Sequence, residues 1–356
     1  MRQVKTLSFA GQNIYCGIDV HKKNWSVCIR DDNFELRTLS QPPKPEILVE
    51  YLHRNYPDAN FQAVYEAGFT GYWAQRVFGK CGIDCKIVHP ADIPMTNKDR
   101  QQKTDRVDCR KLAKALCDDH IKSIYIPPAW QVEDREVLRT RKQLVKDQTR
   151  NKNRIQSFLN FHGIDIPEGY KQSTHFSNLF ITWLEGLNLS ESAKISLVLK
   201  VNTLKQGRSQ LLEANRYIRK LSKNEIYKVQ VELLRSIPSI GLINAMVFLT
   251  ELGDINRFKS LDQLCNYFGL TPNIYSSGET IHVQGITHRC NHILREALVE
   301  SAWSAVRKDP VLLRTYQESI KRMDENKAII KVAKKLLNRI RYVLHNQKPY
   351  IHGVVQ

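Results

Sequence analysis

Two aspartates near the start of a predicted helix form an acid pair surrounded by bases. Asp105 and Asp108 lie in the basic stretch KTDRVDCRK at 103–111, and the pattern predicts a helix over about 104–117. Residues three apart share one helix face, so both carboxylates project from one side, one turn apart. Their repulsion must be offset by nearby bases, by the positive helix end or by a bound divalent cation. The alternative is an ordinary acidic first turn, in which Thr104 or Asp105 caps the helix.

The elements before this helix decide what the pair can do. Apolar runs predict strands, and apolar residues at helical spacing predict helices between the later strands. Short turns join the first three strands into an antiparallel meander, whereas crossover helices force the later strands to run parallel to the first. This is the order of an α/β ribonuclease H-like domain. The predicted strands are 14–20, 25–30, 34–39, 61–66 and 85–89, and the predicted helices are 47–56 and 71–78.

Four acids converge in that order of strands. Asp19 near the end of the first strand and Glu66 at the end of the fourth lie on adjacent strands. The next helix brings Asp105 and Asp108 over the same edge. Asp19 alone would favour a structural interpretation, as an edge residue or part of a solvated face. Four carboxylates together favour a metal site, because two Mg²⁺ ions about 4 Å apart would neutralise them and could clamp a phosphodiester. We predict Mg²⁺ as the cofactor, with Mn²⁺ as the alternative.

The charge balance indicates a polyanionic partner. The chain has 356 residues, with 54 Lys+Arg against 36 Asp+Glu and a net charge of +18. Basic surfaces bind phosphate backbones by releasing counterions, and a membrane surface is the rival polyanion. No run approaches the roughly 18 apolar residues that span a bilayer, and 1–15 contains no apolar signal core. We therefore expect a cytoplasmic protein with no membrane partner. The eight cysteines are expected to be reduced, mostly buried thiols, with zinc as the alternative.

Two long helices are predicted in the middle of the chain. Residues 130–161 are strongly basic, contain no Gly or Pro and carry a thin apolar stripe. A second helix has a coiled-coil seam at Leu204, Gly207, Leu211, Ala214, Ile218 and Leu221. The two helices could pair with each other or with a second subunit. We expect a dimerising arm, and an internal hairpin is the alternative.

The last third of the chain contains a turn and a loop that could contact nucleic acid. A predicted helix, a Pro-x-x-Gly turn containing Ser239 and Gly241, and a second predicted helix together resemble a helix-hairpin-helix. The turn amides of that motif can receive a phosphate. A plain structural turn is equally consistent. Ser276-Ser277-Gly278 lies in a loop that is either a simple turn or a nucleophile, with Gly278 allowing a phosphate to approach the backbone.

Basic residues at two further places are predicted to contact nucleic acid. They are Lys103, Arg106 and Arg110 around the acid pair, and Arg289 and Arg295 in a basic turn entering a helix. Some of these bases will only form a solvated helix face. The sequence predicts three domains: 1–125, an RNase H-fold domain; 126–230, a helical coiled-coil arm with an insert; and 231–356, a mainly α domain ending in an amphipathic basic helix.

Five motifs in order make the chain resemble the DEDD transposases. These are insertion-sequence recombinases described as bridge-RNA-guided, and the Piv-type DNA invertases are related to them. The resemblance spans nearly the whole chain. The motifs are YCGID at 15–19, YEAG at 65–68, KTDRVD at 103–108, IPSIG at 237–241, and GLTP at 269–272 leading to SSG at 276–278.

The resemblance implies a RuvC-like nuclease domain and a serine transposase domain that together form a composite site. Asp19, Glu66, Asp105 and Asp108 would bind the metal, and Ser277 matches the family nucleophile. The implied reaction joins donor DNA to target DNA through a covalent serine–DNA intermediate. The implied partners are two double-stranded DNAs, a structured guide RNA and further copies of the chain in a homodimer or homotetramer.

Two departures and several alternatives accompany this resemblance. The family commonly has a Ser-Lys-x-Gly turn where this chain has THRCN at 287–291, which affects phosphate contacts expected there. Cys109 stands where Ala is usual, a change expected to be neutral. The alternative functions are a protein-directed DNA invertase and a metal-only nuclease of the Holliday-junction type. A nucleic-acid-binding protein without chemistry is a third, which the intact set of four acids disfavours.

Overall fold

The structure is a computed structural model that describes residues 8–93, 104–171, 176–277 and 280–351. Its contacts divide the chain into two compact units, Met1–Ile126 and Pro127–Gln356. The division of the second unit at residues 230 and 231 stays a prediction.

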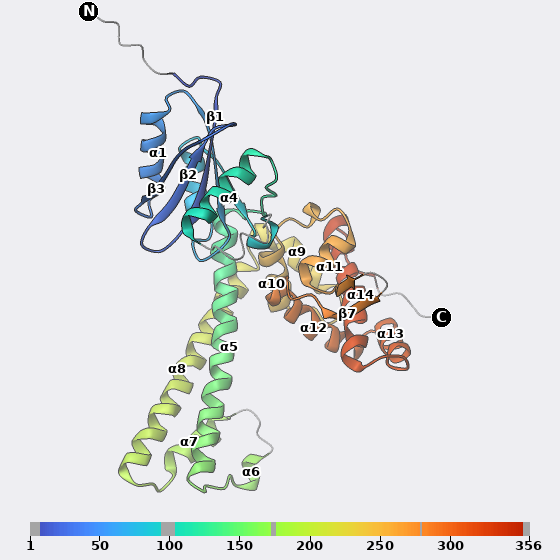
Figure 1. The fold of residues 1–356 in the computed structure, drawn as a ribbon. Helices are drawn as coiled ribbons and strands as arrows, with labels where there is room; N and C mark the ends of the chain where they lie inside the picture. The colour runs from blue at the N-terminus through green and yellow to red at the C-terminus, as the bar shows by residue number, and fades with distance from the viewer. Residues whose placement is uncertain (1–7, 94–103, 172–175, 278–279, 352–356) are drawn as a thin grey trace, which may run out of the picture. The chain divides into compact units, whose positions relative to one another are not determined.

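A five-stranded mixed sheet forms the centre of the first unit (Figure 1). The order is β3-β2-β1-β4-β5, in which β1 pairs antiparallel with β2 and parallel with β4. The remaining pairs are antiparallel β2–β3 and parallel β4–β5. The ribonuclease H-like order predicted from the sequence is therefore confirmed. The strands are β1 (Asn13–Val20), β2 (Trp25–Arg30), β3 (Glu35–Gln41), β4 (Asn60–Glu66) and β5 (Asp84–Val88).

Helices cover both faces of this sheet. Helices α1 (Pro45–Asn55) and α2 (Trp73–Lys80) pack through Leu48, Leu52 and Phe78 onto the face that carries Ile14, Cys16 and Ile18. Since strand side chains alternate, Tyr15, Gly17 and Asp19 lie on the opposite face. That face is covered by α4 (Asp105–Cys117), whose Leu112 and Leu116 contact Tyr15. A short 3-10 helix, η1 (Pro90–Asp92), follows β5.

The second unit begins with two long helices that run side by side (Figure 1). These are α5 (Ala129–Phe161) and α8 (Glu191–Leu221), and between them lie α6 (Glu168–Lys171) and α7 (Asn178–Gly186). The seam predicted on α8 is its more protected face: Leu204, Ile218 and Leu221 are buried. This face packs against α5 of the same chain, which is the internal hairpin that we gave as the alternative. Pairing with a second subunit through this arm stays a prediction.

The rest of the second unit is mainly helical, with one β-hairpin. Its core gathers α9, α10, α11 and α12 around the amphipathic C-terminal helix α14, whose predicted apolar face is buried throughout. The elements are α9 (Glu225–Arg235), α10 (Leu242–Leu252), η2 (Ile255–Arg257), α11 (Leu261–Phe268), β6 (Pro272–Ser277), β7 (Thr280–Ile286), α12 (His292–Val306), α13 (Pro310–Ile320) and α14 (Glu325–Asn346).

Two further expectations concern cysteines and membranes. All eight cysteines are free thiols and five of them are buried, as predicted. Among the helices of the described residues, none combines the length and the apolar character that crossing a bilayer requires.

Candidate metal centre and serine hairpin

The first long helix after the sheet lies directly against the central strand. A Cβ atom added at Gly17 on β1 would lie 2.1 Å from the carbonyl oxygen of Cys109 and 2.3 Å from the amide nitrogen of Ala113. Cys28 on β2 completes this small-residue contact with Cys109 and Ala113. Gly17 therefore allows α4 to rest on the strand that carries Asp19 two residues later.

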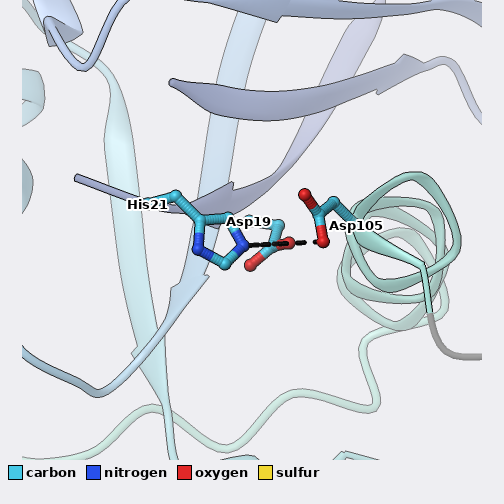
Figure 2. A group of neighbouring side chains, drawn as sticks. All are labelled: Asp19, His21 and Asp105. Atoms are coloured by element: carbon cyan, nitrogen blue, oxygen red, sulfur yellow. Dashed lines mark hydrogen bonds and ion pairs between the residues drawn. The ribbon is translucent and has the colours of Figure 1, made fainter. Parts of the chain in front are cut away.

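This packing brings three side chains together at the end of β1 (Figure 2). The Nε2 atom of His21 lies 3.1 Å from Oδ2 of Asp19 and 3.6 Å from Oδ1 of Asp105. Asp105 is the first residue of α4, and the side chain of Thr104 at the cap position makes no capping hydrogen bond. The carboxylate of Asp105 therefore faces His21 and Asp19 from the helix end.

The second aspartate of the pair lies one turn further along α4. Lys111 Nζ donates to Oδ1 of Asp108 at 3.3 Å. Asp108 is near enough to Asp19 for its charge to raise the pKa of Asp19, as the charge of Asp105 also does. The two carboxylates of α4 thus act electrostatically on the strand acid.

Glu66 ends the neighbouring strand on the same face. The parallel register pairs Ile18 with Tyr65, so Glu66 stands at the next position, beside Asp19. Val64, two residues earlier on β4, packs under α4, which fixes the face on which Glu66 lies. The sheet thus places Glu66 beside Asp19, under the helix that carries Asp105 and Asp108.

The pKa of Asp19 is raised above its ordinary value. Burial is the main cause, and the charges of Asp105 and Asp108 add to it, while the contact with His21 opposes it. A carboxylate that resists ionisation beside two other carboxylates is stabilised in its charged form by a cation. Carboxylate oxygens suit Mg²⁺, whereas an imidazole nitrogen is a ligand that Mn²⁺ accepts more readily. The donor set of Asp19, His21 and Asp105 therefore fits a divalent metal ion.

The bases around the acid pair differ in their partners. Arg110 forms a two-pronged ion pair with Glu35 on β3, with distances of 2.8 to 3.1 Å from its nitrogens to the carboxylate oxygens. Arg106 is exposed. Lys103 lies outside the described residues. Binding of nucleic acid by these three residues stays a prediction.

The candidate nucleophile ends the first strand of the β-hairpin. Ser277 is the last residue of β6, and its Cα partner on β7 is Thr280. Gly278 lies outside the described residues. At the base of the hairpin, Nη1 of Arg295 donates to the carbonyl oxygens of Thr287 at 2.8 Å and Gly269 at 3.3 Å. Arg295, predicted to contact nucleic acid, thus joins the two chain segments from which the hairpin emerges.

A buried acid anchors the base of the β-hairpin to the long helix α5. Glu251 on α10 is only 1% exposed and accepts two hydrogen bonds from Arg139 of α5. It also accepts one from Nδ2 of Asn291 at 2.8 Å. Asn291 caps α12 through the amides of Ile293 and Leu294. The helix that carries Arg295 is therefore fixed to α5 and α10.

The remaining predicted residues lie at two turns. Arg289 is exposed in the turn before α12. Ser239 adopts a left-handed backbone with φ of 78°, and Gly241 takes the cap position of α10 without a capping side chain. A helix, a turn and a helix are present as predicted, and phosphate binding by the turn stays a prediction.

The sequence pattern did not indicate the roles of His21, Gly17 and Glu35. A signal for His21 existed, since a residue two positions after Asp19 continues on the same face as long as the chain stays extended. The contacts of Gly17 and Glu35 reach α4 from distant strands, and no local pattern marks such pairs.

Two family models match the chain. The IS110 DEDD transposase model, described as Transposase, matches residues 16–164, which include the whole acid cluster. The model of the Transposase IS116/IS110/IS902 family matches residues 231–317, which include the hairpin. The chain belongs to this IS110/IS116 transposase family. Members of the family catalyse DNA cleavage and strand transfer, so the chain is an enzyme that acts on DNA.

Relatives of this transposase agree with the family. The chain is 29% identical over 296 residues to a putative transposase, y4qE, of Sinorhizobium fredii, covering 82% of this chain and 71% of the relative. It is 26% identical over 293 residues to the transposase for insertion sequence element IS1111A of Coxiella burnetii, covering 80% and 78%. It is 27% identical over 259 residues to the transposase for insertion sequence element IS1533 of Leptospira borgpetersenii, covering 70% and 72%.

Proposed function

We propose that this transposase cuts and exchanges DNA strands through a covalent bond between Ser277 and DNA, with the help of Mg²⁺ held by Asp19, Glu66, Asp105 and Asp108. The observation that carries the proposal is the meeting of Asp19 and Asp105 at His21, which gathers acids from two elements of a chain in this family. The position of Ser277 at the end of β6, next to Gly278, supports the role of the serine.

The proposed reaction is a transesterification. The hydroxyl oxygen of Ser277 forms a bond to a backbone phosphorus, the bond from that phosphorus to the 3′ oxygen breaks, and the proton of the hydroxyl ends on the released 3′ oxygen. A 3′-hydroxyl of the exchanged strand then attacks the phosphoserine and restores Ser277. One phosphate ester replaces another at each step, so the strands can be rejoined without a further energy source.

The four acids supply the site for the charge-neutralising ion. A bound divalent cation would stabilise the negative charge that develops on the phosphate and on the leaving oxygen. Gly17 keeps α4 against β1, which holds Asp105 near Asp19. Lys111 donates to Asp108 and orients that carboxylate.

A trapping experiment tests the serine. Full-length protein is incubated with end-labelled DNA containing the element junction, denatured, and separated by electrophoresis. We expect a protein–DNA adduct whose digested peptide carries the DNA on Ser277. Ser277→Ala should abolish it, and the matched control Ser276→Ala should retain it. Hydrolysed DNA without an adduct would instead establish a metal-only nuclease.

The test of the four acids measures the strand-exchange product instead of the protein–DNA adduct. Asp105→Asn and Asp108→Asn each remove one charge at nearly constant volume, and both should abolish strand exchange. Glu46→Gln on α1, an acid outside the cluster, is the control that should leave exchange intact. Strand exchange at the normal rate in both aspartate variants would exclude a catalytic metal at this cluster.

We also propose that a structured RNA pairs with donor and target DNA and that the active form is a homodimer or homotetramer. The resemblance of the five motifs to the guided transposases and the net charge of +18 support these partners. Purification from the host followed by sequencing of bound RNA tests the guide. An active preparation free of RNA would favour a protein-directed invertase.

A further inference from the structure

A cavity of about 510 Å³ opens where four helices of the second unit meet. Arg141 of α5 and Arg219 of α8 line one side of it, and the start of α10 lines another. Glu300 and Ser301 of α12 complete the wall. The cavity therefore lies between the arm helices α5 and α8 on one side and the turn at 239–241 on the other.

The start of α10 in this cavity is an uncapped positive helix terminus. The first N–H groups of a helix have no acceptor within the helix. Gly241 offers no side chain to receive them, and Leu242, Ile243 and Asn244 all line the cavity. The helix dipole adds a partial positive charge at this end. A negatively charged group is the favoured occupant of such a terminus.

The two arginines add full charges at the same place. Nε of Arg141 donates to Oδ1 of Asn215 at 2.8 Å. Burial lowers the pKa of Arg141, and the charge of Glu300 partly offsets this. A guanidinium held partly away from water is stabilised by a further negative partner. Arg219 of α8 is exposed and lines the cavity, so its charge is available to a ligand that enters from solvent.

Ser239 and Glu300 also line the cavity. The hydroxyl oxygen of Ser239 is buried, and within the described residues it makes no hydrogen bond. Among the described residues that line the cavity, Glu300 is the one acid, and it is exposed. The two arginines and the helix end therefore leave the cavity positive.

We propose that this cavity binds a backbone phosphate of a nucleic-acid strand, held by Arg141, Arg219 and the amides at the start of α10. The sequence indicated only the turn at Ser239 and Gly241, and the structure adds two arginines from the arm helices. The proposal rests on the finding that the chain acts on DNA and does not depend on the serine chemistry.

Salt-dependent binding tests the cavity in the full chain. Each phosphate contact to duplex DNA contributes about 0.9 to the slope of log affinity against log salt concentration. Arg141→Gln and Arg219→Gln should each weaken binding and reduce that slope by about 1. The control is Arg216→Gln, which makes the same charge change on α8 outside the cavity. Glu300→Gln should tighten binding, and this exposed change does not depend on the packing around Arg141.

Labelled duplex DNA and labelled RNA of the same length are the two probes. A loss confined to one probe identifies the strand that enters the cavity, and a loss with both identifies a shared phosphate site. All measurements use the Ser277→Ala background, so a failure of the proposed nucleophile leaves this test intact. Losses no larger than that of Arg216→Gln with both probes, together with no gain from Glu300→Gln, would overturn the proposal.

Discussion

An imidazole nitrogen lies between two carboxylates at the end of β1. His21 is 3.1 Å from Asp19 and 3.6 Å from Asp105, so its ring stands where a cation would neutralise both acids. A metal ion at this place would either gain the nitrogen as a ligand or displace it. Because imidazole suits Mn²⁺ better than Mg²⁺, the choice of ion distinguishes the two outcomes.

We predict that His21→Ala weakens Mn²⁺ binding more than Mg²⁺ binding. The expected loss for Mn²⁺ is roughly tenfold, at the lower end of what losing a partner in a metal site costs. Calorimetric titration of the purified protein with each ion measures it. His53→Ala on α1 is the control. Equal effects on both ions would mean that the His21 nitrogen is not a metal ligand.

A second residue-scale prediction concerns a buried ion pair in the C-terminal helices. Asp309 is 4% exposed, and Nη1 of Arg339 lies 2.6 Å from its Oδ2. Burial acts to raise the pKa of Asp309, but the hydrogen bonds from Arg339 and from the amide of Leu312 outweigh it, so the pKa is lowered. Such a carboxylate stabilises the fold above its unfolded pKa, and this contribution is lost as pH falls through the lower folded pKa.

Asp309→Asn should therefore destabilise the protein by about 1.5 to 3 kcal/mol at neutral pH. The difference from the unmodified protein should be constant above about pH 4 and shrink below it. Denaturant unfolding across this pH range measures both quantities. Asp324→Asn, at an exposed residue, is the control. A difference that persists unchanged in acid would contradict the role of the ionised pair.

At the residue scale the sequence predicted the four acids but not their neighbours. Strand order and helical spacing predicted that Asp19 and Asp105 would meet, and the structure brings these two together at His21. The role of Asp19, Glu66, Asp105 and Asp108 as one metal site stays a prediction. His21 was missed because its importance depends on a contact with Asp105 that only the packed helix creates.

The contact between α4 and β1 determines how far Asp105 lies from Asp19 and His21. Gly17→Ala would place a methyl group against the backbone at Cys109 and Ala113. We expect a loss of about 1 to 3 kcal/mol in unfolding free energy, as for other overpacked sites. Metal affinity should fall as well, because Asp105 moves with the helix. Gly68→Ala, which meets open space, is the control. Unchanged stability and metal affinity would mean that α4 tolerates the added methyl.

The base of the β-hairpin gives a prediction about positioning. Arg295 bonds the carbonyl oxygens of Gly269 and Thr287, so Arg295→Gln should loosen the hairpin that carries Ser277. We expect the adduct yield to fall tenfold or more, since a displacement of about 1 Å can cost roughly 100-fold in rate. Arg307→Gln, at the end of the same helix, is the control. DNA affinity falling in step with the adduct would instead support the nucleic-acid contact predicted from the sequence.

At the element scale most boundaries could be predicted, and most contacts between elements could not. Strand β2 and the start of α4 were predicted within one residue because turn residues and apolar spacing mark them. The seam on α8 was found, but its partner was not, since the same apolar spacing suits a second chain and α5 equally well.

At the scale of the whole molecule, the first unit holds its own hydrophobic cores. The core clusters that contain Ile14, Tyr15 and Cys28 draw all their buried residues from within residues 14–116. A fragment spanning 1–126 should therefore unfold cooperatively and bind Mn²⁺ as the full chain does. Circular dichroism and calorimetry measure these properties. A fragment without cooperative unfolding would show that the unit depends on the rest of the chain.

The basic net charge predicted a polyanionic partner, and the family confirms DNA as a substrate. The composition could not indicate where the charge gathers, because Arg141 and Arg219 come from different helices and meet only in the folded unit. Long-range juxtapositions of this kind depend on how α5 and α8 align.

That alignment has a consequence for folding fidelity. Gln148 of α5 is buried and donates to the carbonyl oxygen of Leu204, close to Gly207, where a Cβ would lie 2.3 Å from its Nε2. A slip of one heptad would set Lys200 or Ala214 against Gln148, burying a charge or forcing a clash. The glycine therefore favours a single register of the two helices, and hairpins that form out of register should separate again before the arm is complete.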